Sequence, residues 1–377
     1  MKRALVLTLL ISAILTSLTG CNWMDGSYVS VTPHQVGYSD EEDTMMISDF
    51  IDLRSAVIGM IDSGETEGVL PLKDYLQQDI RADMIRVKEY VMSTSPIGAY
   101  AVQSIDYEYD TTDDKNTLSV EISYRHTKAE IGKIHAVYGM DGAKTFLVDT
   151  LNNHRKSLVL LVTRYEDMDI HQWITDYIAL HPEIVMETPQ VSIQTYPEQG
   201  EARVVEILFS YQNSRDSLRQ MQNQVSPIFS SAKLYVSTEV DDLTKLEQLY
   251  TFLMERFDYK YETTQTPAYS LLYSGVGDSK AFAEVYAAMC RQIGVECSVV
   301  PGTYQEQSRY WNLIQLDGIF YHVDLLQSEQ LGSLQLMEHE EMSEYQWDQS
   351  LYPPSGTPVP YRPGPSGGTS HQHSEKS

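Results

Sequence analysis

The stretch that decides the fold runs YSLLYSGVGDSKAFAEVYAAMCRQIGVECSVVPGTY (269–304) and resumes as RYWNLIQLDGIFYHVDLL (309–326). Two glycines lead into Asp278 and Ser279, whose side-chain oxygens are suited to capping the start of a helix. Apolar residues at helical spacing then predict a helix over 279–293. In the second piece, residues 320–324 are expected to form a strand. A capped helix followed by strands therefore forms the centre of this region.

This pattern resembles the core of the transglutaminase-like superfamily. Residues 241–257 form an amphipathic helix where the superfamily has one ahead of its core, and MEHEEMSEYQWDQSLYP (337–353) resembles its closing segment. The resemblance thus covers about 241–353 and implies a papain-like α+β domain. Active members use a Cys-His-Asp triad for acyl transfer or peptide hydrolysis, without a metal or other cofactor. On that pattern the cysteine falls on Ser279, the histidine on Arg309 and the third member on Asp324.

Two of the three catalytic residue types are therefore replaced. The hydroxyl of Ser279 stays protonated at neutral pH and needs a general base. Arg309 cannot be that base, because a guanidinium is effectively always protonated. We expect Arg309 to form an ion pair with Asp324, extended to Ser279 by a hydrogen bond. The domain is then a pseudoenzyme with no catalytic residue, which binds a peptide or cell-envelope ligand or serves as a surface scaffold.

Four neighbouring residues are candidates for the surrounding cleft: Asp278, Tyr310, Trp311 and His322. Tyr310 and Trp311 suit ligand contact and suit packing equally well. His322 lies two residues before Asp324, on the same strand face. It is the alternative base for an active hydrolase or acyltransferase of protease or peptidase type with altered residues. No metal site is expected, and a histidine pair in the tail, His371 and His373, is interpreted as incidental.

The three cysteines have separate roles. A basic start and a short apolar run over residues 1–20 predict a secretory signal. Its ending, Leu-Thr-Gly-Cys, resembles the bacterial lipobox, which implies lipid on Cys21 and an exported protein anchored to the outer face of the cell membrane. The alternative is an ordinary signal peptide with a chance cysteine. Cys290 and Cys297 are expected to be buried and structural, with no disulfide indicated.

The region between anchor and core has its own organisation. Residues 21–49 are predicted to be a tether, and residues 50–235 to hold two repeated β-α-β-β units. Strands over 55–61 and 157–163 are expected to open the units, and hairpins to close them. The fold class is α+β throughout, with the transglutaminase-like domain at 236–353 and a disordered tail rich in Pro, Gly and Ser at 354–377. A further hypothesis makes the repeats the functional part.

The formal charge of −26, from 53 acidic and 27 basic residues, argues against nucleic acid as a partner, because such a surface repels phosphate backbones. The same charge repels anionic envelope polymers. Neither the ligand nor the oligomeric state follows from these patterns.

Overall fold

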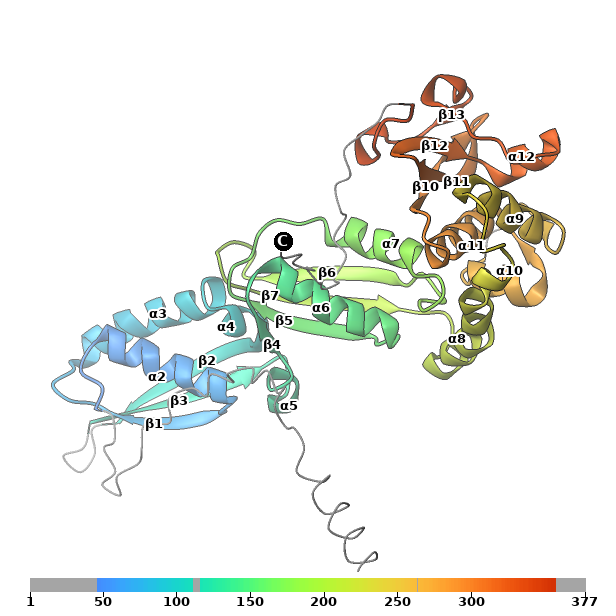
Figure 1. Cartoon of the computed structure of the whole chain (residues 1–377). Helices are drawn as coiled ribbons and strands as arrows, with labels where there is room; N and C mark the ends of the chain where they lie inside the picture. The colour runs from blue at the N-terminus through green and yellow to red at the C-terminus, as the bar shows by residue number, and fades with distance from the viewer. Residues whose placement is uncertain (1–45, 111–115, 263, 357–377) are drawn as a thin grey trace, which may run out of the picture. The chain divides into compact units, whose positions relative to one another are not determined.

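The computed structural model describes residues 46–110, 116–262 and 264–356. The predicted signal, Cys21 and nearly all of the tether lie outside these residues, as do His371, His373 and most of the tail. In the part described, helices and strands are mixed along the whole chain (Figure 1). No helix there combines the length and apolar character needed to cross a membrane.

The first sheet has the strand order β1-β3-β2, and both of its pairings are antiparallel. Two helices lie over it (Figure 1) and supply half of its buried core, including Leu53, Val57, Met84 and Val87. The elements are α2 (Phe50–Ser63), β1 (Glu67–Pro71), α3 (Gln77–Ser93), α4 (Pro96–Ala101), β2 (Val102–Asp110) and β3 (Thr117–Tyr124).

The strand predicted at 55–61 is wrong, because these residues belong to α2. Asp49 caps the helix by accepting hydrogen bonds from the backbone N–H groups of Ile51 and Asp52. The buried positions Leu53, Val57, Met60 and Ile61 follow the helical spacing i, i+4, i+7, i+8. The strand that opens this unit lies later, at β1.

The second sheet has the strand order β4-β5-β7-β6, with a parallel pairing only between β4 and β5. Helices α6 and α7 cover one face of it (Figure 1). Its elements, with a short helix before them, are α5 (Lys128–Ile131), β4 (His135–Val137), α6 (Gly139–Asn152), β5 (Ser157–Val162), α7 (Ile170–Leu180), β6 (Gln190–Tyr196) and β7 (Arg203–Ser210). Both sheets follow the order helix, strand, helix, hairpin, although their equivalence as repeated units stays a prediction.

The C-terminal domain combines a helical half with the four-stranded sheet β12-β11-β10-β13. Its helical half holds α8 (Arg215–Ser230), η2 (Ala232–Leu234), α9 (Asp242–Met254), α10 (Pro267–Ser274) and α11 (Ser279–Gln292), with the short strands β8 (Asp258–Tyr259) and β9 (Val276–Gly277). The sheet half holds β10 (Cys297–Tyr304), β11 (Gln307–Leu316), β12 (Ile319–Val323), α12 (Leu325–Leu331), η3 (His339–Glu341), β13 (Tyr345–Gln346) and η4 (Gln349–Leu351).

Helix α11 is the centre of this domain, and ten of its successive residues, 281–290, are buried. The sheet anchors it through Asn312 of β11, whose Nδ2 donates to the carbonyl oxygen of Ala283 at 2.9 Å. Helix α8 also belongs to this core, with Leu218, Val225 and Phe229 buried against it. The domain core therefore begins before the boundary expected at residue 236.

Candidate functional site

Ser279 is the first residue of α11, as the sequence predicted. Asp278 caps the helix, since its Oδ1 accepts a hydrogen bond from the backbone N–H of Ala281 at 2.9 Å. Gly277 allows the strand-to-helix turn to pack closely, because a Cβ there would lie 2.7 Å from the Cβ of Ala281. Burial raises the pKa of Asp278, against the opposing effect of its hydrogen bond from Ala281. Ser279 is only 7% exposed, so its hydroxyl is held at the floor of a recess.

The predicted ion pair between Arg309 and Asp324 is present and is bidentate. The Nε atom of Arg309 donates to Oδ2 of Asp324 at 2.8 Å, and its Nη2 atom donates to Oδ1 at 2.8 Å. Arg309 lies on β11, and Asp324 directly follows β12, its antiparallel neighbour. The side chains are 12% and 1% exposed. The planar guanidinium thus meets the carboxylate in the fork geometry that makes such pairs strong.

Asp324 has further donors beyond the arginine. The hydroxyl of Tyr345 on β13 donates to Oδ2 at 2.9 Å. The backbone N–H groups of Leu326 and Gln327 donate to Oδ1, because Asp324 caps α12. Burial lowers the pKa of Arg309, but the hydrogen bonds and charge of Asp324 outweigh it, so the net direction is upward. Arg309 is therefore a permanent cation with no proton to exchange.

The expected extension of this pair to Ser279 is absent. The Oγ atom of Ser279 instead accepts a hydrogen bond from the backbone N–H of Tyr310 at 3.2 Å. A hydroxyl becomes a nucleophile only when a base takes its proton. No His, Asp or Glu side chain accepts a hydrogen bond from it in the described chain.

His322 is not brought to Ser279. Its Nδ1 accepts a hydrogen bond from Nε1 of Trp311 at 3.0 Å, and the ring is 1% exposed. Burial, with a smaller contribution from His339, lowers the pKa of His322 to about 4. The shared strand face noted in the sequence did not place it beside the hydroxyl, and the structure gives no hydrogen bond between the two. His322 lines a different pocket.

Tyr310 and Trp311 point to opposite faces of β11, as successive strand residues do. Tyr310 lines a pocket of about 530 Å³ together with Asp278 and Ser279, whereas Trp311 is 1% exposed and packs in the core. We call this cavity the Ser279 pocket. Its lining residues are Tyr259, Tyr261, Glu262, Asp278, Ser279, Ser308 and Tyr310. Of the four predicted cleft residues, the structure therefore brings only Asp278 and Tyr310 to Ser279.

Five side chains of this site, Ser308 among them, were not predicted from the sequence. Tyr345 lies in the closing segment 337–353, but its hydrogen bond to Asp324 depends on the pairing of β13 with β10. Tyr259, Tyr261 and Glu262 follow α9 and reach the pocket because β8 pairs with β9, immediately before Asp278. The two tyrosines flank Lys260, and this Tyr-Lys-Tyr pattern is the local signal in the sequence for a tyrosine-lined site.

The two cysteines of the described chain, Cys290 and Cys297, are part of the packed core. Cys290 and Cys297 are both buried and free. Burial, and then the neighbouring Cys297, raise the pKa of Cys290, which keeps it a thiol. Within the described residues, no cluster of three or more His, Cys, Asp or Glu side chains is arranged to hold a metal ion.

A family model described as the transglutaminase-like superfamily matches residues 231–325. This part of the chain is a transglutaminase-like domain. No curated protein matches the chain in sequence.

Among solved structures, the chain is similar to a TGase at 8% identity and a TM-score of 0.24, covering 45% of this chain and 51% of that one. It is similar to calcium-bound LapG of Legionella pneumophila at 14% identity and a TM-score of 0.26, covering 40% and 87%. A candidate cysteine protease from Cytophaga hutchinsonii matches at 12% identity and a TM-score of 0.24, covering 42% and 73%. The chain therefore spans about half the length of the TGase.

Proposed function

We propose that the transglutaminase-like domain is a non-catalytic peptide-binding module. In this proposal the Ser279 pocket holds the peptide, and lipid on Cys21 anchors the protein to the outer face of the cell membrane. Any activity of acyl-transfer type has been lost with the cysteine and histidine.

The observation that carries the proposal is the bidentate bond between Arg309 and Asp324. In an active triad the third residue orients an imidazole that takes the nucleophile's proton. Here both oxygens of Asp324 accept hydrogen bonds from the arginine, and no base among the described residues is hydrogen-bonded to the hydroxyl of Ser279. Loss of acid–base assistance alone costs a factor of about 10²–10⁴ in rate. Loss of the thiolate removes the nucleophile as well.

The pocket lining favours a peptide with a basic side chain. Three tyrosine rings supply flat apolar surface with polar edges, which is typical of peptide and protein recognition. Glu262 and Asp278 supply carboxylates, and no lysine or arginine is among the described lining residues, although Nζ of Lys280 lies 6.0 Å from the centre of the Tyr310 ring. A cation beside carboxylates and tyrosine rings gains both ion pairing and cation–π attraction. The same lining disfavours an acidic peptide.

Binding is tested with two fluorescein-labelled peptides that alternate glycine with either lysine or glutamate, by fluorescence anisotropy on the full chain. We expect the lysine peptide to bind and the glutamate peptide not to bind. Tyr310→Ala should weaken binding about tenfold, the loss of one aromatic contact of about 1.4 kcal/mol. Tyr138→Ala is the matched control, since Tyr138 is 71% exposed and does not line the pocket.

Equal binding of the two peptides, or an equal effect of the two tyrosine variants, would contradict this assignment. The anchor is tested separately. Cys21→Ala should move the protein from the membrane fraction to the released fraction in a bacterial host that processes lipoproteins. Retention of this variant in the membrane fraction would count against lipid on Cys21.

A further inference from the structure

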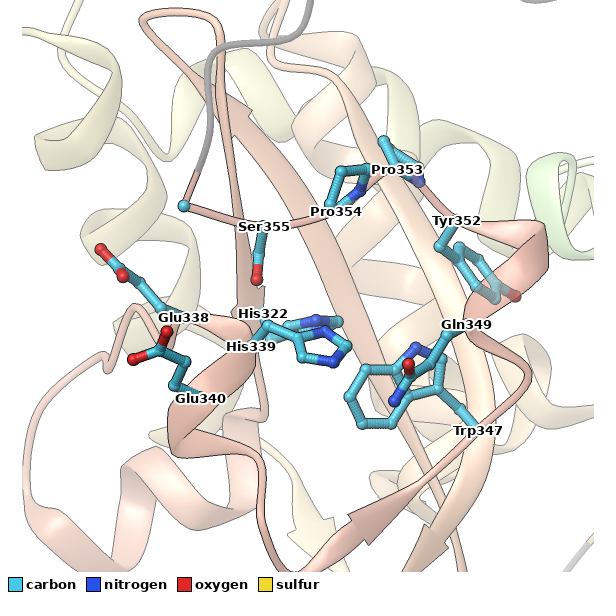
Figure 2. A pocket seen from close by; sticks show the side chains of 11 residues that line it. His322, Glu338, His339, Glu340, Trp347, Gln349, Tyr352, Pro353, Pro354 and Ser355 are labelled. Carbon is cyan, nitrogen blue, oxygen red and sulfur yellow. The ribbon is translucent and has the colours of Figure 1, made fainter.

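The transglutaminase-like domain has a second pocket that shares no lining residue with the Ser279 pocket (Figure 2). Its volume is about 470 Å³, within the range of small-molecule sites. We call it the His322 pocket. Its walls come from the end of β12, from η3 and from the segment that follows β13. Nothing in the proposed peptide-binding function uses it.

His322 presents a hydrogen-bond donor to this pocket. The indole Nε1–H of Trp311 can only donate, so Nδ1 of His322 must accept at their 3.0 Å contact. The imidazole is neutral at pH 7, because burial lowers its pKa to about 4. Its single proton therefore lies on Nε2. Within the described residues, no side chain or backbone oxygen is hydrogen-bonded to Nε2, which leaves this N–H for a ligand.

A second buried polar group lies in the same pocket. The Oγ atom of Ser355 has no hydrogen-bond partner in the part of the chain that the structure describes, and it is shielded from solvent. Figure 2 shows it directed toward the rings of His322 and His339. Buried polar groups in proteins nearly always have partners, so an unpaired one needs an explanation. Two unpaired donors at one spot indicate a ligand that carries acceptor oxygens.

Trp347 supplies a fixed aromatic wall. Its ring centroid lies 5.0 Å from those of His322 and His339 and 5.6 Å from that of Trp311, each in an edge-to-face arrangement. Three such contacts hold the indole at a defined angle. The ring is half-buried, so part of its surface remains available beside the unpaired donors.

The charges around the pocket narrow the ligand class. Glu338 and Glu340 contribute carboxylates and Gln349 an amide, while no lysine or arginine is among the described residues that line the pocket. An anionic ligand would be repelled by the two carboxylates. A simple cation would gain nothing from donors such as the Nε2–H of His322. A neutral ligand rich in hydroxyl groups suits both the carboxylates and the unpaired donors, because each hydroxyl can accept and donate a hydrogen bond.

We propose that the His322 pocket binds a neutral saccharide. A sugar hydroxyl oxygen accepts from His322 Nε2–H and from Ser355, and other hydroxyls donate to the carboxylates of Glu338 and Glu340. The apolar C–H face of the sugar ring packs on Trp347. This site is independent of peptide binding at the Ser279 pocket, so either can fail without the other.

Calorimetric titration of the full chain tests the proposal with three neutral tetrasaccharides: chitotetraose, cellotetraose and maltotetraose. Tetragalacturonate and tetralysine are the anionic and cationic comparisons. We expect at least one neutral tetrasaccharide to bind at millimolar or lower concentration, and neither charged probe to displace it. Trp347→Ala should weaken that binding at least tenfold, and Ser308→Ala, in the Ser279 pocket, should leave it unchanged.

Two substitutions of His322 separate ligand contact from folding. His322→Asn places an amide oxygen near the position of Nδ1, which keeps the acceptor for Trp311 but removes the donor at Nε2. His322→Gln places an amide N–H near Nε2, which keeps the donor but removes the acceptor. We expect binding to fall about tenfold in His322→Asn, the loss of one hydrogen bond, and to be better retained in His322→Gln.

Near-ultraviolet circular dichroism and the thermal transition monitor folding of each variant. If the histidine variants fail to fold, Glu340→Gln replaces them as the test of ligand contact, because Glu340 is exposed. It should weaken saccharide binding about threefold, as the loss of one rim contact. The proposal is overturned if no neutral tetrasaccharide binds at millimolar concentration. It is also overturned if binding survives in folded Trp347→Ala and His322→Asn, or if tetralysine competes for the site.

Discussion

The Ser279 pocket and the His322 pocket belong to one domain but differ in how their polar groups are satisfied. Ser279, in the first pocket, accepts a hydrogen bond from Tyr310, and beside this pocket Asp324 accepts hydrogen bonds from Arg309, Tyr345 and two backbone N–H groups. At the second, Nε2 of His322 and Oγ of Ser355 meet no partner in the described chain. Polar groups whose hydrogen bonds are made within the chain stabilise the fold, whereas unpaired polar groups are available to a ligand.

This difference bears on the role of Arg309. Arg309 supplies two of the donors that a buried aspartate needs. A buried charge is costly unless it is paired and hydrogen-bonded. The pair of Arg309 and Asp324 is thus a structural clamp between the ends of β11 and β12, and three tyrosines line the pocket beside it.

The largest expected effect comes from breaking the clamp. Arg309→Leu leaves Asp324 buried without its cation, so the free energy of unfolding should fall by roughly 3–5 kcal/mol. Urea denaturation of the full chain measures it. Lys144→Leu is the control, since its partner Asp141 is 96% exposed. Such a surface pair contributes about 0–1 kcal/mol. Similar losses in the two variants would mean that the clamp has no structural role.

The next effect is a pH dependence carried by His322. Its pKa is about 4 in the folded chain and about 6.5 in the unfolded one, so the unfolded chain takes up this proton first as the pH falls. The contribution of His322 is therefore fully present above pH ~6.5 and is lost progressively toward pH ~4, by up to about 3 kcal/mol. Urea denaturation at pH 7, 5.5 and 4.5 should show a steeper decline for the wild type than for His322→Asn. Parallel curves would contradict the buried neutral imidazole.

A smaller effect is expected from Tyr345→Phe, which removes one donor from Asp324 and leaves the arginine in place. Hydrogen bonds to charged groups contribute about 1.5–3 kcal/mol, and the remaining donors of Asp324 should keep the loss near the lower end. Thermal and urea unfolding measure it. Combined with Arg309→Leu, the losses should not add, because both act on one carboxylate. Strict additivity would show that the two donors act independently.

The C-terminal domain could be predicted from the sequence because its pattern is dense and local. The cap at Asp278, the apolar spacing of α11 and the strand pair around Arg309 and Asp324 are all visible in short segments. An ion pair between Arg309 and Asp324 was expected from the positions that the superfamily pattern assigns to them, and the structure adds its bidentate geometry. Each of these features depends on residue types within a short segment of the chain.

Other features could not be predicted, for two physical reasons. The segment at 55–61 is apolar enough for either a strand or a helix, and the cap at Asp49 and the spacing of Leu53 and Val57 decide for the helix. The sites of Tyr345 and His322 depend on pairings distant in sequence: β13 with β10, and His322 with Met337 through a bridge. Strand alternation fixes the face of a side chain, but not which pocket that face borders.

The central claim is that Ser279 and Arg309 occupy an intact but non-catalytic frame, and restoring the triad types tests it most directly. Ser279→Cys alone and Ser279→Cys with Arg309→His are exposed at pH 7 to a peptide vinyl sulfone, and mass spectrometry locates the modified residue. We predict labelling at position 279 that is on the order of 10²-fold faster in the double variant, because only it has an imidazole to take the thiol proton. The wild type should not be labelled at Ser279, Cys290 or Cys297. Equal rates in the two variants, or modification of wild-type Ser279, would contradict the account.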